Sequence, residues 1–148
     1  MKAYLASSYS RRHEMQGRRT QLHDEGIVVT SRWLDDEDPW DPADHARGYR
    51  LAAKDLEDIR EADVVVCFTG EPVTTTGGRH VEFGYALGIG KPIVVVGPAE
   101  NVFYCLRNER IARFEYWDDD AEGALEQLII LRDWYERFDH IFQGSKVL

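Results

Sequence analysis

The sequence has few of the features that mark secreted, metal-binding or membrane proteins. It contains two cysteines, Cys67 and Cys105, and no CxxC pair, as is typical of a reduced, cytoplasmic protein. Its five histidines show neither HxxxH nor HExxH spacing, so we expect no metal. The longest apolar runs, 64–68 and 92–96, are too short to span a bilayer, and no secretory apolar region follows Met1.

An excess of positive charge is also missing. Lys and Arg number 18 against 27 Asp and Glu, which gives a formal net charge of −9. A phosphate backbone or an anionic membrane surface attracts basic proteins, so nucleic-acid polymers and membranes are not expected as partners. The length of 148 residues and the hydrophobic content of 43% suit a single globular domain spanning residues 1–148.

The glycine motifs of common phosphate-binding loops are absent. Neither GxGxxG nor GxxxxGK[ST] occurs, which argues against a dinucleotide fingerprint and a Walker-type loop. We therefore expect no cofactor, and a dinucleotide-dependent oxidoreductase is the least favoured function.

What the sequence does contain is an alternation of short apolar runs with helix-compatible segments. The predicted strands are 2–7, 27–30, 63–69, 92–96 and 111–116, and the predicted helices are 11–25, 44–62, 79–87 and 120–138. This order predicts an α/β fold of three layers, flavodoxin- or Rossmann-like, with a five-stranded, mainly parallel sheet and helices on both faces. Ligands of such sheets bind at the carboxyl ends of the strands, where the strand order reverses.

Two carboxylates are candidates for chemistry at that edge. Asp55 lies on the apolar stripe of a predicted helix with Ala52 and Ile59, so it is paired, protonated, functional, or at the stripe's edge in solvent. Glu82 falls in the expected first turn of the next helix, where the helix dipole favours its anion. It is either an ordinary first-turn residue or a nucleophile. Two such carboxylates in one crevice would suit cleavage of a glycosidic bond.

An acidic segment, 35–44, contains two prolines and is expected to be a loop. It is either a solvated surface loop or a lid over a site. Trp33 lies just before this segment and Trp40 within it, and both are expected to pack in the core.

Three segments together resemble a known family. They are Tyr4-Leu5-Ala6-Ser7, Asp55 placed eight residues before Asp63-Val64-Val65-Val66, and the run from Gly77 to Pro92 with its Glu-x-Gly-x-Ala-x-x-x-Gly-Lys-Pro pattern. Over residues 3–103 the chain is similar to the nucleoside 2-deoxyribosyltransferase family, which includes relatives that hydrolyse 2′-deoxynucleoside 5′-monophosphates.

The resemblance implies a role for each aligned residue. Glu82 would attack C1′ of the sugar and form a glycosyl ester, and Asp55 would protonate the departing base and later deprotonate the incoming base or water. Tyr4 would complete this catalytic set by hydrogen bonding near the nucleophile and holding it in place. Tyr9 would stack on the base, although a surface aromatic is an equal alternative.

The resemblance also implies residues around the 5′ end of the substrate. Thr76 stands where transferases of free nucleosides usually carry an aspartate and the monophosphate hydrolases a serine, and a hydroxyl there could donate to a phosphate. The expected contributors to such a pocket are Ser8, Thr74, Thr75, Thr76, Gly77 and Arg79, with Arg11 supplying further charge, and Ser7 and Gly78 are also expected to bind the substrate. Asn101 or Tyr104 would reach a neighbouring subunit's site in a homo-oligomer, unless this segment only caps a short helix.

The predicted function is cleavage of the N-glycosidic bond of a 2′-deoxynucleoside or its 5′-monophosphate, with transfer of the sugar to another base. One alternative is an N-glycosidase that transfers the sugar of a nucleoside 5′-monophosphate to water. A second is a non-catalytic nucleotide-binding module, against which the presence of both Asp55 and Glu82 argues. The sequence leaves open the preferred base, the sugar and the 5′ group.

Overall fold

Short apolar runs form the centre of the protein. A computed structural model describes residues 1–70, 77–117 and 123–143, with side chains as far as residue 137. Every residue of β3 (Val64–Phe68) and β4 (Ile93–Val96) is buried. These strands have no polar face because helices cover both sides of the sheet, as expected for parallel strands.

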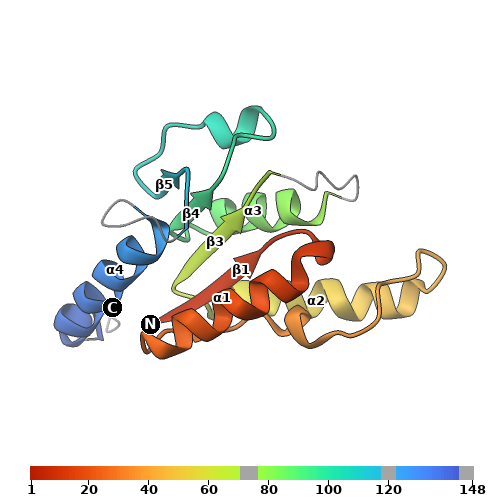
Figure 1. Ribbon diagram of the computed structural model, residues 1–148, viewed down its shortest axis with the longest axis horizontal. Coiled ribbons are helices and arrows are strands. Elements are labelled where there is room, and N and C mark those ends of the chain that lie inside the picture. Colours follow the sequence, from red (N-terminus) through yellow and green to blue (C-terminus); the bar gives the residue numbers. More distant parts are fainter. Residues whose placement is uncertain (71–76, 118–122, 144–148) are drawn as a thin grey trace.

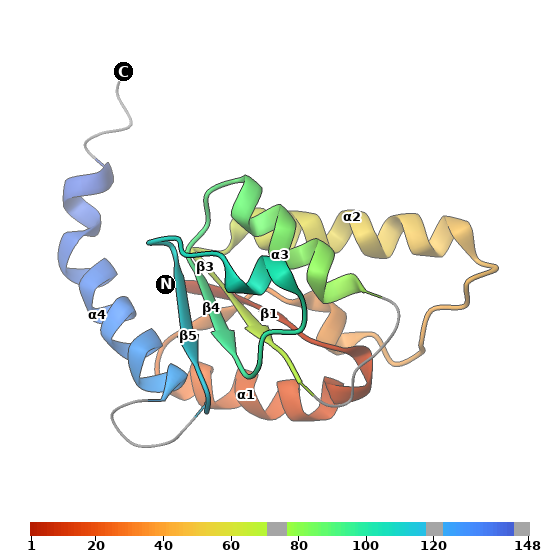
Figure 2. The same cartoon turned by 90° about the horizontal axis from the view of Figure 1, so that it is seen from above.

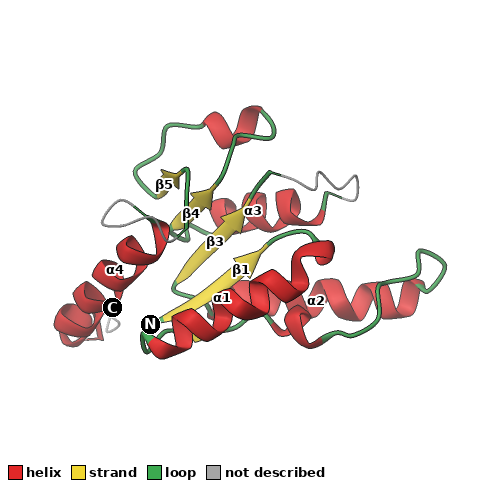
Figure 3. Cartoon of the chain, in the orientation of Figure 1, coloured by secondary structure: helices red, strands yellow, loops and turns green. Residues whose placement is uncertain are grey.

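Five parallel strands make one sheet in the order β2-β1-β3-β4-β5 (Figures 1 and 3). The remaining strands are β1 (Lys2–Ala6), β2 (Val28–Val29) and β5 (Ile111–Phe114). The predicted fold class is therefore confirmed. The strand order reverses between β1 and β3, so the loops that follow these two strands open onto the usual ligand position of such sheets.

Helices occupy both faces of the sheet. In Figure 2, α2 (His45–Glu61) and α3 (Gly78–Gly88) lie over one face, and α1 (Arg12–Asp24) lies over the other. The last helix, α4 (Ala124–Gln143), runs along the β5 side, and its Arg132 pairs with Glu25 just after α1. Among the described helices, none is both long enough and apolar enough to cross a membrane.

Two of the three short 3-10 helices were not predicted, η1 (Tyr9–Arg11) and η2 (Arg32–Asp35). The third, η3 (Val102–Cys105), is the short helix given as the alternative for the segment at Asn101. Each is only one turn long, too short to produce a hydrophobic period. The first two follow β1 and β2 directly, and the third follows β4 after a short loop. They therefore shape the edge of the sheet where a ligand would bind.

Aromatic packing fixes α3 against η3. Phe83 and Tyr104 are both buried, and their ring centroids lie 4.5 Å apart. The Tyr104 hydroxyl lies 3.0 Å from Nδ1 of His80. Phe83 directly follows Glu82, so this packing fixes the position of the carboxylate on α3.

An ion pair fixes α2 to η2. Asp58 is 2% exposed, and its carboxylate accepts hydrogen bonds from the backbone N–H of Arg32 at 2.9 Å and from Arg32 Nε at 2.6 Å. The start of α2 is capped by Asp44, whose Oδ1 accepts from the backbone N–H of Arg47 at 2.9 Å. Asp55, three residues before Asp58, is thereby held on a helix anchored at both ends.

Candidate active site

A cavity of about 850 Å³ opens at the carboxyl end of β1 between α2 and α3. Its volume falls in the range of small-molecule sites, roughly 300–1,000 Å³. Asp55 from α2 and Glu82 from α3 both line it, as do Ser7 and Ser8 from the loop after β1. The two candidate carboxylates, 27 positions apart in the sequence, therefore share one cavity.

Glu82 is held by the buried first strand. The hydroxyl of Tyr4, which is fully buried, donates a 2.8 Å hydrogen bond to Glu82 Oε1. The other oxygen, Oε2, is buried and has no hydrogen-bond partner among the described residues. This leaves one oxygen fixed and one oxygen available to a ligand.

Asp55 shows the same pattern. Its Oδ1 is buried and lacks a hydrogen-bond partner in the described part of the chain. Burial, supported by the negative charges of Asp58 and Asp36, raises the pKa of Asp55 to about 7, although Lys54 opposes the shift. An unpaired buried carboxyl is costly to fold, which makes a functional role the better explanation for it.

The pKa of Glu82 is also raised, to about 8, first by burial and then by the negative charge of Asp55, while the hydrogen bond from Tyr4 lowers it. Two interacting carboxyls with raised pKa values share protons near neutral pH, so the neutral and the ionised form of each are both accessible. Such a pair can supply both a carboxylate and a carboxylic acid to one substrate.

The prediction that the helix dipole favours the ionised form of Glu82 was wrong. The helix α3 begins at Gly78, so Glu82 is its fifth residue and lies beyond the first turn. The dipole acts mainly within that turn. The ionised state of Glu82 is favoured by Tyr4 instead, a contact that requires the folded sheet and that helix position alone could not predict.

Arg79 lies in the cavity wall but its charge is already paired. It is 4% exposed, and its Nε donates to Glu100 Oε2 at 2.7 Å while its Nη2 donates to Glu100 Oε1. Its Nη1 is buried and has no partner among the described residues. Glu100, which the sequence pattern did not indicate, thus compensates the charge that was expected to attract a phosphate.

Four of the other predicted binding residues line the cavity: Ser7, Ser8, Tyr9 and Gly78. The hydroxyl of Ser7 is buried without a described partner, whereas that of Ser8 lies 3.1 Å from the Ser10 hydroxyl. Tyr9 donates from its hydroxyl to the backbone oxygen of Asp36 at 2.8 Å. The predictions for Thr74, Thr75 and Thr76 lie outside the described residues.

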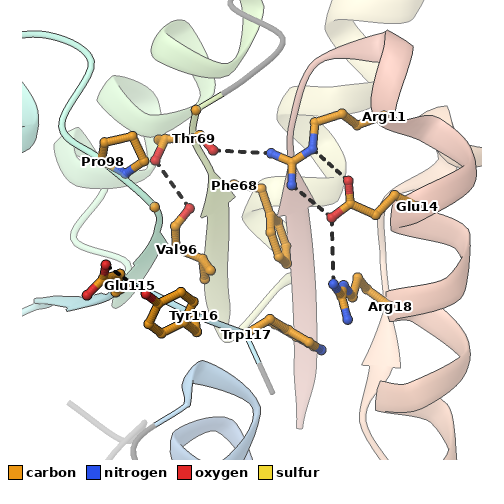
Figure 4. A pocket seen from close by; sticks show the side chains of 12 residues that line it. Arg11, Glu14, Arg18, Phe68, Thr69, Val96, Pro98, Glu115, Tyr116 and Trp117 are labelled. Carbon is orange, nitrogen blue, oxygen red and sulfur yellow. Dashed lines mark hydrogen bonds and ion pairs between the residues drawn. The ribbon is translucent and has the colours of Figure 1, made fainter. Parts of the chain in front are cut away.

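Arg11 does not line this cavity, and its predicted part in a 5′-phosphate pocket with Thr74, Thr75 and Thr76 stays a prediction. It lines a second cavity of about 560 Å³ at the carboxyl ends of β3 and β4 (Figure 4). There it pairs with Glu14 at 2.8 Å and donates to the backbone oxygen of Thr69 at 3.2 Å. The sequence could not separate the two sites, because Ser8 and Arg11 belong to one short loop that reaches both.

The two residues expected to serve a neighbouring subunit lie outside the cavity of their own chain. Tyr104 is fully buried in the core, so its predicted contact with a substrate in another subunit is wrong for this conformation. Asn101 caps η3, where its Oδ1 accepts from the backbone N–H of Phe103 at 2.9 Å. The segment therefore does cap a short helix, and a further role for Asn101 in a neighbouring site stays a prediction.

The acidic loop contributes directly to the site. Asp36, Asp38 and Trp40 line the cavity, so the loop covers part of it. Trp33 is 8% exposed and packs in the core as expected, whereas Trp40 is 47% exposed and the prediction that it lies in the core was wrong. No sequence pattern separates the two tryptophans, because both are embedded in polar segments.

No group of three or more His, Cys, Asp or Glu side chains within residues 1–70, 77–117 and 123–143 is arranged to hold a metal ion. The expectation that the protein needs neither metal nor cofactor stays a prediction.

Comparisons with known proteins address the family directly. A family model described as nucleoside 2-deoxyribosyltransferase matches residues 3–126. Among solved structures, a 2-deoxyribosyltransferase from Bacillus psychrosaccharolyticus is 23% identical with a TM-score of 0.65, and the match covers 86% of this chain and 96% of that one. A CMP N-glycosidase from Clostridium botulinum is 18% identical with a TM-score of 0.54, covering 88% and 99% of the two chains.

A conserved protein from Enterococcus faecalis is similar as well, at 19% identity and a TM-score of 0.52, with coverage of 86% of this chain and 70% of that one. No curated protein is similar enough in sequence to count as a match. At these identities the structural likeness establishes the fold, and the family model, which spans most of the chain, establishes the family. The chain belongs to the nucleoside 2-deoxyribosyltransferase family.

Proposed function

We propose that the protein cleaves the N-glycosidic bond of 2′-deoxynucleosides through a covalent intermediate on Glu82 and transfers the sugar to a second base. The observation that carries this proposal is the pair of carboxyl oxygens, Glu82 Oε2 and Asp55 Oδ1, that lack described partners on residues lining one cavity. A binding module has no need to bury two such groups, because each costs stability.

In the first step Glu82 Oε2 attacks C1′ of the sugar, and the bond between C1′ and the base nitrogen breaks. The electron pair of that bond leaves with the base, which takes a proton from the carboxylic acid of Asp55. A glycosyl ester of Glu82 and the Asp55 carboxylate remain. Tyr4 keeps its hydrogen bond to Oε1 and so holds the carboxylate in position.

In the second step a nitrogen of the incoming base attacks C1′, and its proton passes to the Asp55 carboxylate. The bond between C1′ and Glu82 breaks, which restores the ionised Glu82 and the protonated Asp55. Inversion at each step gives retention overall. Water in place of the second base would give hydrolysis, so the outcome depends on how well the base site excludes water.

The charges around the cavity support a nucleoside as substrate over its 5′-monophosphate. Among the described residues, four carboxyl groups line the cavity: Asp36, which Lys54 pairs, and Asp38, Asp55 and Glu82. The guanidinium that faces them, Arg79, is compensated by Glu100. A phosphate dianion would meet net negative charge there, whereas a neutral 5′-hydroxyl could accept a hydrogen bond from Arg79 Nη1.

The test is incubation of the protein with deoxyinosine and free adenine, followed by chromatography. Formation of deoxyadenosine is expected. Free deoxyribose alone would instead mean hydrolysis, and a parallel reaction with deoxynucleoside 5′-monophosphates tests the alternative substrate.

Glu82→Ala should lower turnover by at least about 10³-fold, since it removes the nucleophile. Glu57→Ala, which removes a half-exposed carboxylate outside the cavity, serves as the matched control. Full turnover by Glu82→Ala would refute the mechanism.

We further propose that the protein works in the cytoplasm as a homo-oligomer. Support comes from the exposed apolar side chains of Val102 and Phe103, which are 76% and 63% exposed beside Asn101. Apolar surface of this kind is typical of subunit contacts. Sedimentation of the purified protein tests the proposal, and a monomer at all concentrations would contradict it.

A further inference from the structure

We propose that Trp40 is a base-stacking residue that gives this site a preference for purine over pyrimidine bases, an inference that rests on the proposed function. The starting observation is that Trp40, a residue of the acidic loop, lines the cavity with about half of its surface exposed. An exposed indole in a ligand cavity offers a flat apolar face, on which any base can stack.

The indole has a defined seat on α2. Its Nε1 donates to the backbone oxygen of Asp44 at 3.0 Å. A Cβ added at Gly48 would come within 2.9 Å of Trp40 Nε1 and 3.1 Å of Cε2, closer than side chains tolerate. The ring therefore packs directly on the backbone of Gly48, and a glycine is needed there for the ring to lie where it does.

The loop that carries Trp40 is fastened to its surroundings at three positions before the tryptophan. Asp36 pairs with Lys54 at 2.8 Å, and its backbone oxygen accepts from the Tyr9 hydroxyl. Arg47 donates to the backbone oxygens of Asp38 and Pro39, at 2.8 and 3.3 Å. These contacts hold the indole in place before any ligand binds, so stacking on it would cost little ordering.

The position of Gly48 relative to Asp55 sets the size of base that reaches the indole. The two residues are seven apart on one face of α2, which corresponds to two turns and about 10 Å along the helix. Ala52, between them on the same face, is small and lines the cavity. A base whose glycosidic nitrogen lies at Asp55 would extend along this face of α2 toward Trp40. Because a purine has a second ring, it would come closer to Trp40 than a pyrimidine does.

Four variants test the proposal, with kcat/KM measured for deoxyinosine and deoxyadenosine against thymidine and deoxycytidine. Trp40→Ala is expected to lower kcat/KM for the purine nucleosides by about 5- to 100-fold, the range for loss of one base-aromatic stack. The change for the pyrimidine nucleosides should be less than about 3-fold on the same principle. Trp40→Phe should recover part of the loss, because it restores a smaller aromatic face.

Gly48→Ala displaces the indole without removing it, and should shift the purine to pyrimidine ratio in the same direction as Trp40→Ala. Alanine is the better helix former, so a weakened helix cannot explain the loss. Gly17→Ala is the matched control, since Gly17 lies within α1 and has no atom within 4 Å of an added Cβ. It should leave the ratio unchanged.

The outcomes separate this inference from the proposed function. Equal losses for purines and pyrimidines in Trp40→Ala, or no loss at all, would overturn the role of Trp40 while leaving Glu82 as the nucleophile. If the wild-type protein turns over no nucleoside, calorimetric binding of free adenine replaces the rate. Weaker adenine binding by Trp40→Ala and Gly48→Ala than by Gly17→Ala would then support the stacking role, and equal or absent binding would refute it.

Discussion

Glu82 is subject to two opposing demands. As the proposed nucleophile it must be ionised, yet burial and the charge of Asp55 favour its neutral form. Its folded pKa is raised, so between about pH 4.5 and pH 8 the folded protein holds more protons at this position than the unfolded chain, and stability falls as the pH rises. The carboxylate therefore destabilises the fold in the pH range where it would react.

Glu82→Gln should stabilise the protein while abolishing turnover. Glutamine keeps an acceptor for Tyr4 and cannot ionise. The free energy of unfolding of Glu82→Gln, relative to that of the wild type, should therefore increase by roughly 2–4 kcal/mol between about pH 5 and pH 8.5. Urea unfolding at both pH values measures this. Glu57→Gln, in an exposed ion pair, should show no comparable growth, and a pH-independent difference for Glu82→Gln would contradict the raised pKa.

Tyr4→Phe tests whether the buried hydroxyl positions Glu82. The hydrogen bond from Tyr4 lowers the pKa of Glu82, so its loss should move the pH profile of kcat/KM to higher pH. The rate near pH 6 should fall about tenfold for every pH unit by which the profile moves. A purely structural effect would lower the rate equally at every pH.

Sequence reasoning identified the two carboxylates, and the family resemblance identified the hydrogen bond from Tyr4 to Glu82, but other parts of their surroundings were missed. Asp55 was found because an acidic residue interrupted an apolar stripe, which is a local signal. Three features were missed: the raised pKa of Glu82, the pairing of Arg79 with Glu100, and the packing of Trp40 on Gly48. Each depends on side-chain burial or volume, or on contacts between different segments of the chain. None of these has a periodic pattern that a sequence can display.

At the scale of elements, the segments that follow β3 and β4 leave no room for a side chain at Gly97. Gly97 directly follows β4 with a φ of +113°, and a Cβ there would lie 2.7 Å from Thr69 Oγ1 and 2.9 Å from the Thr69 backbone oxygen. The chain segments leaving β3 and β4 thus approach each other as closely as backbone allows. Only glycine meets both the dihedral and the spatial requirement.

Gly97→Ala should lower the free energy of unfolding by more than about 2 kcal/mol, because it adds both backbone strain and a steric clash. Gly17→Ala, in an open position of α1, should instead raise it by roughly 0.5–1 kcal/mol. Chemical unfolding of both variants provides the comparison. A neutral result for Gly97→Ala would show that the two strand ends can separate.

The longer elements were predictable for a physical reason that the shorter ones lack. The run 64–68 is apolar at every position because the sheet is covered on both faces, and α2 shows a helical period because one of its faces packs on the core. The strand predicted at 27–30 is formed only by Val28–Val29, although the backbone N–H of Thr30 still donates to the backbone oxygen of Ala3 at 2.9 Å. The single turns η1, η2 and η3 are set by their tertiary contacts.

At the scale of the whole molecule, charge should decide between nucleoside and nucleotide. The net charge of −9 adds a long-range repulsion to that of the acidic cavity. At low salt, kcat/KM for a deoxynucleoside 5′-monophosphate should be at least about tenfold below that for the nucleoside and should rise with ionic strength. The neutral substrate should respond little. A monophosphate rate that falls with salt would mean net attraction and would favour the hydrolase alternative.

The arrangement of the cavity along α2 has a consequence for redesign. Asp55, the proposed acid, and Gly48, the seat of the indole, lie two turns apart on α2, while Glu82, the proposed nucleophile, lies on α3 and is held by Tyr4 of β1. The proposed base-stacking residue and the proposed nucleophile therefore belong to different parts of the fold, and Asp55 on α2 is the proposed catalytic group that the base site shares. A biocatalyst for unnatural nucleosides could be sought by diversifying the first turns of α2 and the segment before it, while Glu82 and Tyr4 are left unchanged.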